Sequence, residues 1–287
     1  MNLGVEPAGP EPERSRPPRA EEIFLAAAVF VAATVLLTWP QAARMGSGLG
    51  DLWDAKLNAW IFHWDYHQTF HDPLRLFHAN IFHPARYALA FSENLWGAAL
   101  FGFPLYAAGA STLFVYNFLF LLGMFLSAMA AWALAREVTG NAAASLLAGL
   151  VFAFVPWRLA QIPHVQFQWG PFLPLSLLFV LRWLNGGRRR DLFLFALFFA
   201  WNALTNVHFA IFSGILLGVV LAWEGLTGDA VAGGRRIRDT LAATAVCALA
   251  GARIYRVHQV VETRQVVDMV RSIAGLRLPE RAIRGLA

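Results

Sequence analysis

Long apolar runs separated by short polar stretches dominate this chain. A helix needs about twenty apolar residues to cross a bilayer, so runs approaching that length predict membrane-spanning helices. The candidate spans are residues 23–39, 95–110, 113–134, 142–156, 167–184, 192–207, 209–223 and 240–252. The pattern therefore predicts an all-α fold, a polytopic transmembrane helical bundle with about seven spans. Juxtamembrane helices are expected in a long first outer loop, residues 41–94.

Arginine clusters orient the predicted bundle, because short cytoplasmic loops carry an excess of basic residues. The clearest clusters are residues 188–190 and 235–238, and the leader adds Arg14, Arg16 and Arg19. These clusters predict a cytoplasmic N-terminus and an outer loop 41–94. Because loop 41–94 is then outside and residues 188–190 are inside, the chain must cross the membrane an odd number of times between them. Four apolar runs lie in that interval, so one of them does not span.

The run 95–110 is the weakest of these four, since it is short and interrupted by three glycines and Pro104. We expect it to be a re-entrant or juxtamembrane element at the outer face. Arg136 is then cytoplasmic, and the loop 157–166 lies outside. The alternative is that residues 95–110 span and a later run does not.

Composition restricts the class of protein. Hydrophobic residues make up 58% of the chain and charged residues only 14%, which indicates an integral membrane protein. Lys56 is the only lysine, and the arginines follow the predicted topology, so the basic charge does not indicate a nucleic-acid partner. The lone Cys247 excludes a disulfide framework. No Gly-rich phosphate loop is present, and no organic cofactor is expected.

The two ends differ from the apolar middle. The leader, residues 1–22, is rich in Pro, Glu and Arg, which predicts a disordered cytoplasmic tail. Residues 23–252 form the expected transmembrane domain. Residues 253–287 are basic, with valines at near-helical spacing, and predict a surface amphipathic helix. Because this tail stops without a closing element, we expect the chain to be a fragment of a longer protein.

The most informative polar segment is residues 53–71, whose pattern predicts a helix ending before Pro73. Trp53, Trp60 and Trp64 share one stripe of this helix, and a second stripe contains Asp54, Asn58, Ile61 and Asp65. Such a helix is expected to lie in the interface with its tryptophans in the headgroup layer. The acidic stripe would then face a water-filled cavity.

Several polar residues have an alternative structural interpretation. Asp51 is well placed to cap this helix, which leaves Asp54 free to project. Glu93 is placed either to cap the element at 95–110 or to bind substrate. His63, His67 and His71 repeat every four residues, but no accompanying glutamate supports a metal site. Asn202, Asn206 and His208 are placed either to join helices or to line a cavity.

Several segments together resemble GT-C-type glycosyltransferase-like bacterial membrane proteins. They are residues 54–65 (DAKLNAWIFHWD), 76–84 (LFHANIFHP), 92–97 (SENLWG), 134–140 (LAREVTG), 152–158 (FAFVPWR) and 164–166 (HVQ). The resemblance covers about residues 23–223. It implies a multi-span enzyme that takes a sugar from a polyprenyl-phosphate carrier, with an essential Asp near the start of the first outer loop.

Carried over by position, that catalytic residue is Asp54, with Asp51 as the second choice. It would act as a general base on the acceptor hydroxyl or would orient it. Positive charge is needed near the phosphate leaving group, and Arg86 and Arg158 are the outer-side candidates. The remaining substrate-binding candidates are Asn58, Asp65, Glu93, His164 and Gln166.

Two departures separate the chain from that pattern. The acidic pair often found at this site is absent, because Asp54 is followed by Ala55 and Lys56. The chain is also shorter than full-length members. The expected function is transfer of a sugar from a polyprenyl-phosphate donor to an acceptor at the outer face of the membrane. The alternatives are a transporter or flippase, for which no internal repeat is visible, and a non-catalytic membrane protein. The sequence identifies neither the sugar nor the acceptor, and it leaves metal dependence open.

Overall fold

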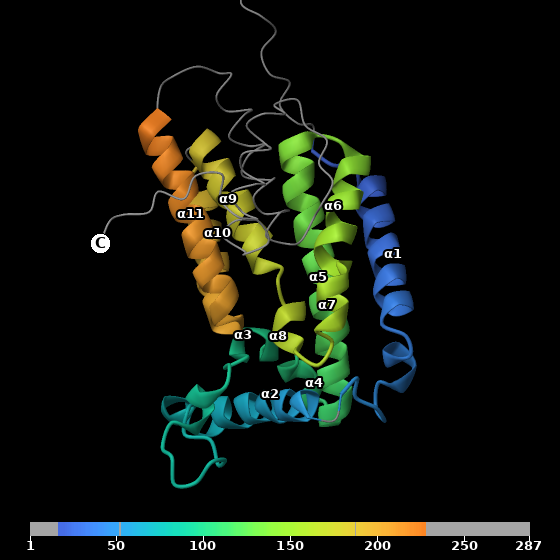
Figure 1. Ribbon diagram of the computed structural model, residues 1–287, viewed down its shortest axis with the longest axis vertical. Coiled ribbons are helices and arrows are strands. Elements are labelled where there is room, and N and C mark those ends of the chain that lie inside the picture. Colours follow the sequence, from blue (N-terminus) through green and yellow to red (C-terminus); the bar gives the residue numbers. More distant parts are fainter. Residues whose placement is uncertain (1–16, 52, 187, 228–287) are drawn as a thin grey trace, which may run out of the picture.

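All regular structure in the described part of the chain is helical (Figure 1). The computed structural model describes residues 17–51, 53–186 and 188–227. Most of the leader, the expected span 240–252 and the tail 253–287 lie outside the described residues. The α-helices are α1 Ala20–Leu37, α2 Asp54–His71, α3 Trp96–Ala99, α4 Phe103–Ala107, α5 Thr112–Thr139, α6 Ala142–Phe154, α7 Pro156–Ala160, α8 Val165–Gln168, α9 Phe172–Gly186, α10 Arg189–Thr205 and α11 Val207–Thr227. Short 3₁₀ turns occupy Gln41–Arg44, Pro73–Arg75 and Ala88–Phe91.

Three helical segments are long and apolar enough to cross a membrane: Ala20–Leu37, Thr112–Thr139 and Ala142–Ala160. The apolar stretch Val207–Val220 is shorter, and α9 and α10 have only 15 and 17 residues. The all-α prediction is therefore confirmed, and three of the expected spans have the required length and composition. On α1, Phe24 and Leu36 are 78% and 73% exposed, as expected of side chains that face lipid.

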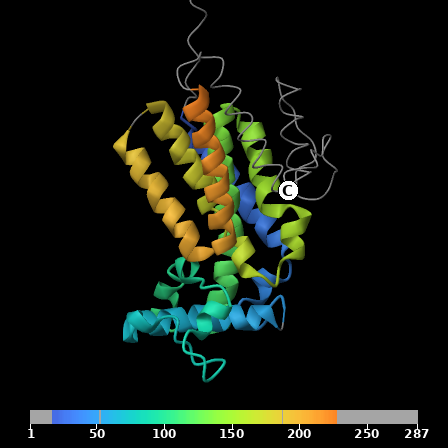
Figure 2. The same cartoon turned by 60° about the vertical axis from the view of Figure 1, so that its left-hand side comes forward.

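The long helices form a bundle, and α2 lies across one end of it (Figures 1 and 2). Residues 95–110 fold into α3 and α4, which have four and five residues and lie at the same end. Helices this short cannot cross a bilayer. The chain therefore leaves α1 and enters α5 at one end of the bundle, as predicted from the charge pattern.

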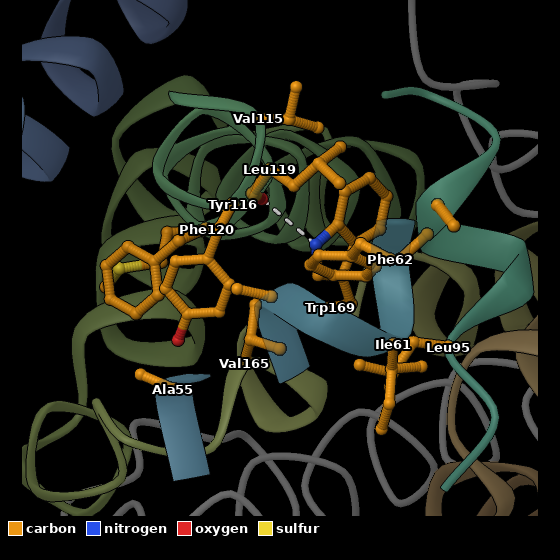
Figure 3. Close-up of a cluster of buried hydrophobic side chains, with 14 of the residues drawn as sticks. Ala55, Ile61, Phe62, Leu95, Val115, Tyr116, Leu119, Phe120, Val165 and Trp169 are labelled. Carbon is orange, nitrogen blue, oxygen red and sulfur yellow. Dashed lines mark hydrogen bonds between the residues drawn. The ribbon is translucent and has the colours of Figure 1, made fainter. Parts of the chain in front are cut away.

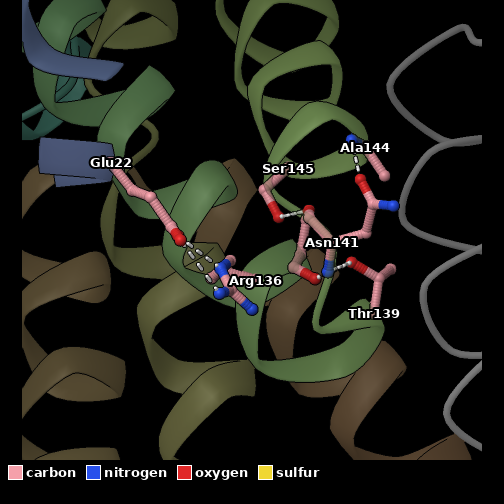
Figure 4. Close-up of polar contacts among 7 residues, drawn as sticks. Glu22, Arg136, Thr139, Asn141, Ala144 and Ser145 are labelled. Atoms are coloured by element: carbon pink, nitrogen blue, oxygen red, sulfur yellow. Dashed lines mark hydrogen bonds and ion pairs between the residues drawn. The ribbon is translucent and has the colours of Figure 1, made fainter. Parts of the chain in front are cut away.

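The opposite end of the bundle carries ion pairs between neighbouring helices. Arg136 of α5 donates from Nε to Oε2 of Glu22 on α1 at 2.9 Å (Figure 4). Arg182 of α9 pairs with Glu137 at 2.6 Å. Gly140, with φ of 65°, ends α5 in the left-handed conformation that glycine adopts without strain. Asn141 then accepts a hydrogen bond from the Ala144 amide and caps α6. A tight α5–α6 hairpin results.

The core is centred on α5 and extends to the end where α2 lies (Figure 3). Phe62 of α2, Tyr116 of α5 and Trp169 are almost fully buried there. The Trp169 indole donates to the Leu119 carbonyl at 2.9 Å, which satisfies its only polar atom. A side chain at Gly123 would come within 2.8 Å of this indole, so the absence of one allows the ring to pack on α5. This core fixes α2 and the α8 segment relative to the bundle.

Candidate functional site

The first turn of α2 begins the site. Asp51 accepts hydrogen bonds from the backbone amides of Trp53 at 2.7 Å and Ala55 at 3.5 Å. Its carboxylate therefore satisfies amides at the helix start, as the sequence predicted. Asp54 is the first residue of α2, and its side chain is 52% exposed. Because Asp51 accepts the hydrogen bonds from these amides, the Asp54 carboxylate is available for contacts outside the helix.

Asp54 meets His164, a residue 110 positions later in the chain. Oδ2 of Asp54 and Nε2 of His164 are 3.0 Å apart, and His164 immediately precedes α8. With Asp54 ionised, Nε2 carries the hydrogen and donates it to the carboxylate. Nδ1 of the neutral ring is then a lone pair. That nitrogen is buried and has no hydrogen-bond partner. An acid that orients a histidine in this way prepares the other ring nitrogen to accept a proton.

Amide side chains fix the same segment to its neighbours. Asn58, one turn beyond Asp54, contacts the Pro163 carbonyl at 3.5 Å and Oε1 of Gln166 at 3.4 Å. The Gln166 carbonyl accepts from Asn206 at 2.9 Å, at the α10–α11 junction. The predicted site residues Asp54, Asn58, His164 and Gln166 are therefore brought together. Asn58 and Gln166 contact each other, so both are positioned by the fold.

A second acid–histidine pair lies nearby. Oε1 of Glu93 is 2.6 Å from Nδ1 of His208. Its other oxygen, Oε2, is buried without a partner. Burial raises the pKa of Glu93 above its usual value, and His208 and the more distant His164 oppose that rise. The histidines of both pairs therefore influence the pKa of Glu93. Glu93 contacts a histidine rather than the start of α3, where Asn94 accepts a hydrogen bond from the Trp96 amide at 2.9 Å.

One aromatic ring joins the two pairs. The Phe167 ring lies 5.9 Å from the His164 ring and 6.2 Å from the His208 ring, measured between centroids. Phe209 is also 6.2 Å from Phe167. The two histidines therefore flank an apolar wall, which lowers the effective dielectric around their polar atoms and strengthens their electrostatic interactions.

Arg158 of α7 is the cation of this region. The residue is 3% exposed, and neither NH1 nor NH2 has a hydrogen-bond partner among the residues that the structure describes. The guanidinium lies 4.8 Å from the centre of the Phe152 ring and 5.9 Å from that of Phe209. No acid forms a salt bridge with it among the residues that the structure describes. Two aromatic faces compensate a buried charge only in part, so the guanidinium is well suited to bind an anion.

The expectation that the acidic stripe faces a water-filled cavity is wrong. Asn58, Ile61 and Asp65 are 5%, 0% and 0% exposed. The reason is that α2 lies flat on the end of the bundle, with this stripe against the core. Of this stripe, only Asp54, in the first turn of α2, extends beyond the core. The tryptophan stripe is partly covered as well, because Trp60 and Trp64 stack on each other at 5.7 Å and only Trp53 is fully exposed.

Asp65 is a buried acid at a distance from the first turn of α2. Asn94 donates to its Oδ1 at 3.3 Å, and Oδ2 is buried without a partner. Burial raises the pKa of Asp65 to about 8, although the Asn94 hydrogen bond opposes the rise. A carboxyl in this environment is mostly protonated at neutral pH. In the structure, Asp65 therefore links α2 to Asn94, two residues before α3, rather than contacting the Asp54–His164 pair.

Two other predicted groups lie apart from the pairs. Arg86 is exposed in the loop that follows α2, which hangs below the C-terminal end of that helix (Figure 1). His67 and His71 stack at 4.0 Å, and Nδ1 of His71 contacts the His67 carbonyl at 2.7 Å. Among the described residues, no group of three or more His, Cys, Asp or Glu side chains is arranged to hold a metal ion.

Two contributors were not identified as site residues from the sequence. His208 was noticed only as a polar residue at the junction of two apolar runs. Its position immediately after the break at Asn206 was the available signal, because a polar side chain at a helix junction has access to a neighbouring loop. Phe167 gave no signal, since nothing in an apolar run distinguishes the ring that separates two histidines.

Comparisons with known proteins give only partial matches. No protein-family model matches the chain, and no solved structure matches it. A stretch of 87 residues, 30% of the chain, is 47% identical to a protein of Mycobacterium leprae named inactive dihydropteroate synthase 2. Proteins of the same name from Mycobacterium bovis and Mycobacterium tuberculosis are 60% identical over 52 residues, 18% of the chain. These stretches span only 26% and 16% of the relatives' own lengths.

These findings contradict the resemblance to GT-C-type glycosyltransferase-like proteins. The curated proteins that match carry a different name, and no family model supports the resemblance. A physical reason is that its motifs consist of tryptophans, histidines and an acid at a helix start. Any helix that lies at a membrane interface favours those residues, so they do not distinguish one family from another.

Proposed function

We propose that this protein is a membrane transferase that moves a sugar from a polyprenyl-phosphate donor to an acceptor hydroxyl. The proposal rests on the chemistry of one end of the bundle. An acid–histidine pair there can accept a proton, and a buried arginine without an acid partner can bind a phosphate. His164 of this pair and Arg158 belong to the segment that connects α6 to α8, and Asp54 comes from α2.

His164 is the proposed general base, with Asp54 as the residue that orients it. Asp54 holds the hydrogen on Nε2, so Nδ1 is the atom that receives the proton of the acceptor hydroxyl. This differs from a role in which Asp54 itself is the base. The side chains of His164 and Asp54 are 37% and 52% exposed, whereas Nδ1 itself is buried, so the proposal requires the acceptor to displace the groups that cover this nitrogen.

The observation that carries the proposal is the buried, unpaired guanidinium of Arg158. Arginine stays charged in proteins, and leaving a buried charge without a partner costs several kcal/mol, on the order of 3–5. A phosphate oxygen pair matches the fork of NH1 and NH2 and would remove that cost. The charge would then stabilise the phosphate as it leaves.

The reaction follows from these two roles. The acceptor oxygen forms a bond to the anomeric carbon of the sugar while its proton passes to Nδ1 of His164. The bond between that carbon and the phosphate oxygen breaks, and its electron pair stays on the phosphate beside Arg158. The acceptor attacks in a single displacement from the face opposite the departing phosphate, so the configuration at the sugar carbon inverts.

The placement in the membrane is part of the proposal. Helices α9, α10 and α11 are proposed to cross with the three long apolar helices, because they align with them in the bundle (Figure 2). The end that carries Arg136 and Arg188–Arg190 is assigned to the cytoplasm by the charge rule. The end with α2 and Asp54 then faces outward at the inner membrane, where lipid-linked phosphates present their headgroups.

The test uses the full chain in proteoliposomes with a panel of radiolabelled polyprenyl-phosphate sugars. Asp54→Asn should lower the rate of transfer by about 10²–10⁴-fold, because the amide no longer fixes the histidine tautomer. Asp72→Asn is the matched control, since Asp72 is an exposed acid at the other end of α2 whose ion-pair partner is Arg75. It should transfer like wild type.

Arg158→Gln separates donor binding from proton transfer. It should weaken binding of the polyprenyl phosphate, whereas His164→Gln should lower turnover with binding retained. Transfer by the Asp54→Asn protein at the wild-type rate would refute the proposed chemistry. Uptake of a labelled solute into the liposomes without transfer would favour the transporter alternative.

A further inference from the structure

Trp157 is an exposed aromatic side chain beside the proposed phosphate site, and the chemistry described above gives it no role. It is the second residue of α7 and directly precedes Arg158. Trp157 is 51% exposed, whereas Arg158 is buried. Successive side chains of a helix point about 100° apart, so α7 turns the arginine inward and leaves the indole at the surface. The large apolar area of this indole is therefore open to a ligand.

One ring connects the indole to both acid–histidine pairs. Phe167 packs edge to face against Trp157, with 5.3 Å between the ring centroids. The same phenylalanine lies 5.9 Å from the His164 ring and 6.2 Å from the His208 ring. Rings packed in this way hold each other in place, so the position of the indole relative to the two histidines is fixed by the fold.

A second series of contacts leads from the indole to the buried cation. The Phe209 ring lies 6.2 Å from Phe167, and the Arg158 guanidinium lies 5.9 Å from the centre of the Phe209 ring. Trp157, Phe167 and Phe209 therefore form an aromatic wall that begins at the surface and ends at the guanidinium. A ligand whose anionic group binds Arg158 has this wall beside the atoms that follow its anionic group.

The chemistry of the wall favours a sugar over a hydrocarbon chain. Its rings are apolar, but the side chains of the two histidines beside Phe167 are polar and partly exposed. A hydrocarbon chain along the wall would cover the histidines without offering them hydrogen bonds, which is unfavourable. A sugar ring has a face of C–H groups for an aromatic ring and hydroxyl groups at its edge for the histidines. An apolar lining with a few polar groups fixes the orientation of such a ligand.

We propose that the Trp157 indole packs against the sugar of the lipid-linked donor, an inference that rests on the proposed function. The phosphate binds at Arg158, and the sugar that it carries lies along the aromatic wall with a C–H face on the indole. The hydrogens of that face carry a small positive charge and the face of an aromatic ring is negative, so their attraction adds to the burial of apolar area. Trp157 is thus a specificity-determining residue, because it recognises the sugar and not the lipid that carries it.

The test measures binding of undecaprenyl-phosphate glucose, mannose and galactose to the full chain in detergent micelles. The matched ligand is undecaprenyl methyl phosphate, a phosphodiester of the same charge without a sugar. Trp157→Ala removes the indole, and Trp157→Phe retains a smaller ring. Trp39→Ala is the matched control variant, since Trp39 is 65% exposed and is not among the site residues. The melting temperatures of the variants confirm that each is folded.

Trp157→Ala should weaken binding of the sugar lipid that wild type binds most tightly by about tenfold and leave the methyl diester unchanged. Trp157→Phe should lose less than Trp157→Ala, and Trp39→Ala should match wild type with both lipids. Equal weakening of the sugar lipid and the methyl diester by Trp157→Ala would assign the indole to the prenyl chain and overturn the proposal. Unchanged binding of both would overturn it as well.

Arg158→Gln reports separately on the proposed function, because it should weaken the sugar lipids and the methyl diester alike. If it changes neither while Trp157→Ala still weakens the sugar lipid, the proposed phosphate site fails and the sugar contact stands. Failure of wild type to bind any of these lipids would overturn both proposals.

Discussion

Replacing Asp65 by Asn should make the protein more stable at neutral and alkaline pH. Asp65 is fully buried against the bundle, and one of its oxygens has no hydrogen-bond partner. Burial raises its pKa from 3.8 to about 8, so the folded protein must keep a proton that the unfolded chain releases. Asparagine has nearly the same shape and no charge to neutralise. The substitution therefore removes this proton requirement.

The magnitude follows from the two pKa values of Asp65. Below about pH 4 both states are protonated, and the residue adds no pH dependence. Between pH 4 and pH 8 the unfolded state binds fewer protons than the folded state, so stability falls as pH rises. The fall is about 1.4 kcal/mol per pH unit, which makes the cost about 4 kcal/mol at pH 7. Above pH 8 the folded carboxyl also ionises, and the dependence on pH levels off.

The assay is thermal unfolding in detergent micelles, followed by intrinsic tryptophan fluorescence from pH 5 to pH 9. Wild type should lose melting temperature between pH 5 and pH 8, and Asp65→Asn should flatten most of that decline. Asp72→Asn, at the exposed end of α2, is the control and should follow wild type. If Asp65→Asn melts below wild type at every pH, or if the two proteins lose stability in parallel, the argument from burial is refuted.

Three further predictions concern the packing of the bundle. Gly149→Ala should destabilise the protein by about 1–3 kcal/mol, because the new methyl would come within 2.3 Å of a phenylalanine ring of α1. Gly186→Ala meets nothing within 4 Å and should melt like wild type; equal losses in the two variants would contradict the packing argument. Trp169→Phe should cost about 1 kcal/mol or more through the lost hydrogen bond to α5, measured by denaturant unfolding. A double-mutant cycle of Glu22→Gln and Arg136→Gln should show a coupling of about 1 kcal/mol or more at low salt, and additive effects would show that the pair is not stabilising.

Local patterns in the sequence were sufficient to predict the long helices. Apolar runs of sufficient length specify helices in any context, because a buried or lipid-facing backbone must satisfy its hydrogen bonds internally. The interruption of residues 95–110 by glycines and Pro104 predicted the break that became α3 and α4. The hydrogen bonds from Asp51 to amides at the start of α2 were also predicted, because such contacts depend only on neighbouring residues.

The composition of the site was predicted in part. Asp54, Asn58, His164 and Gln166 were each selected as site residues from the sequence, but the contacts between them join positions more than a hundred residues apart. Periodicity within one helix carries no information about such contacts. The family resemblance was also wrong. It rested on motifs that are common at membrane interfaces, and such local composition does not show that two proteins belong to one family.

The sequence by itself determined which stretches form long helices, with ends that differ from the observed ones by several residues, and which residues near them carry charge. Only the tertiary structure decided which face of α2 is buried. A stripe at helical spacing shows that residues share a face, yet whether that face meets water or a core depends on what packs on it. Here α2 lies flat on the bundle, so Asp65 is buried and Asp54 is left to meet His164. Packing between distant segments, which no local pattern records, made that choice.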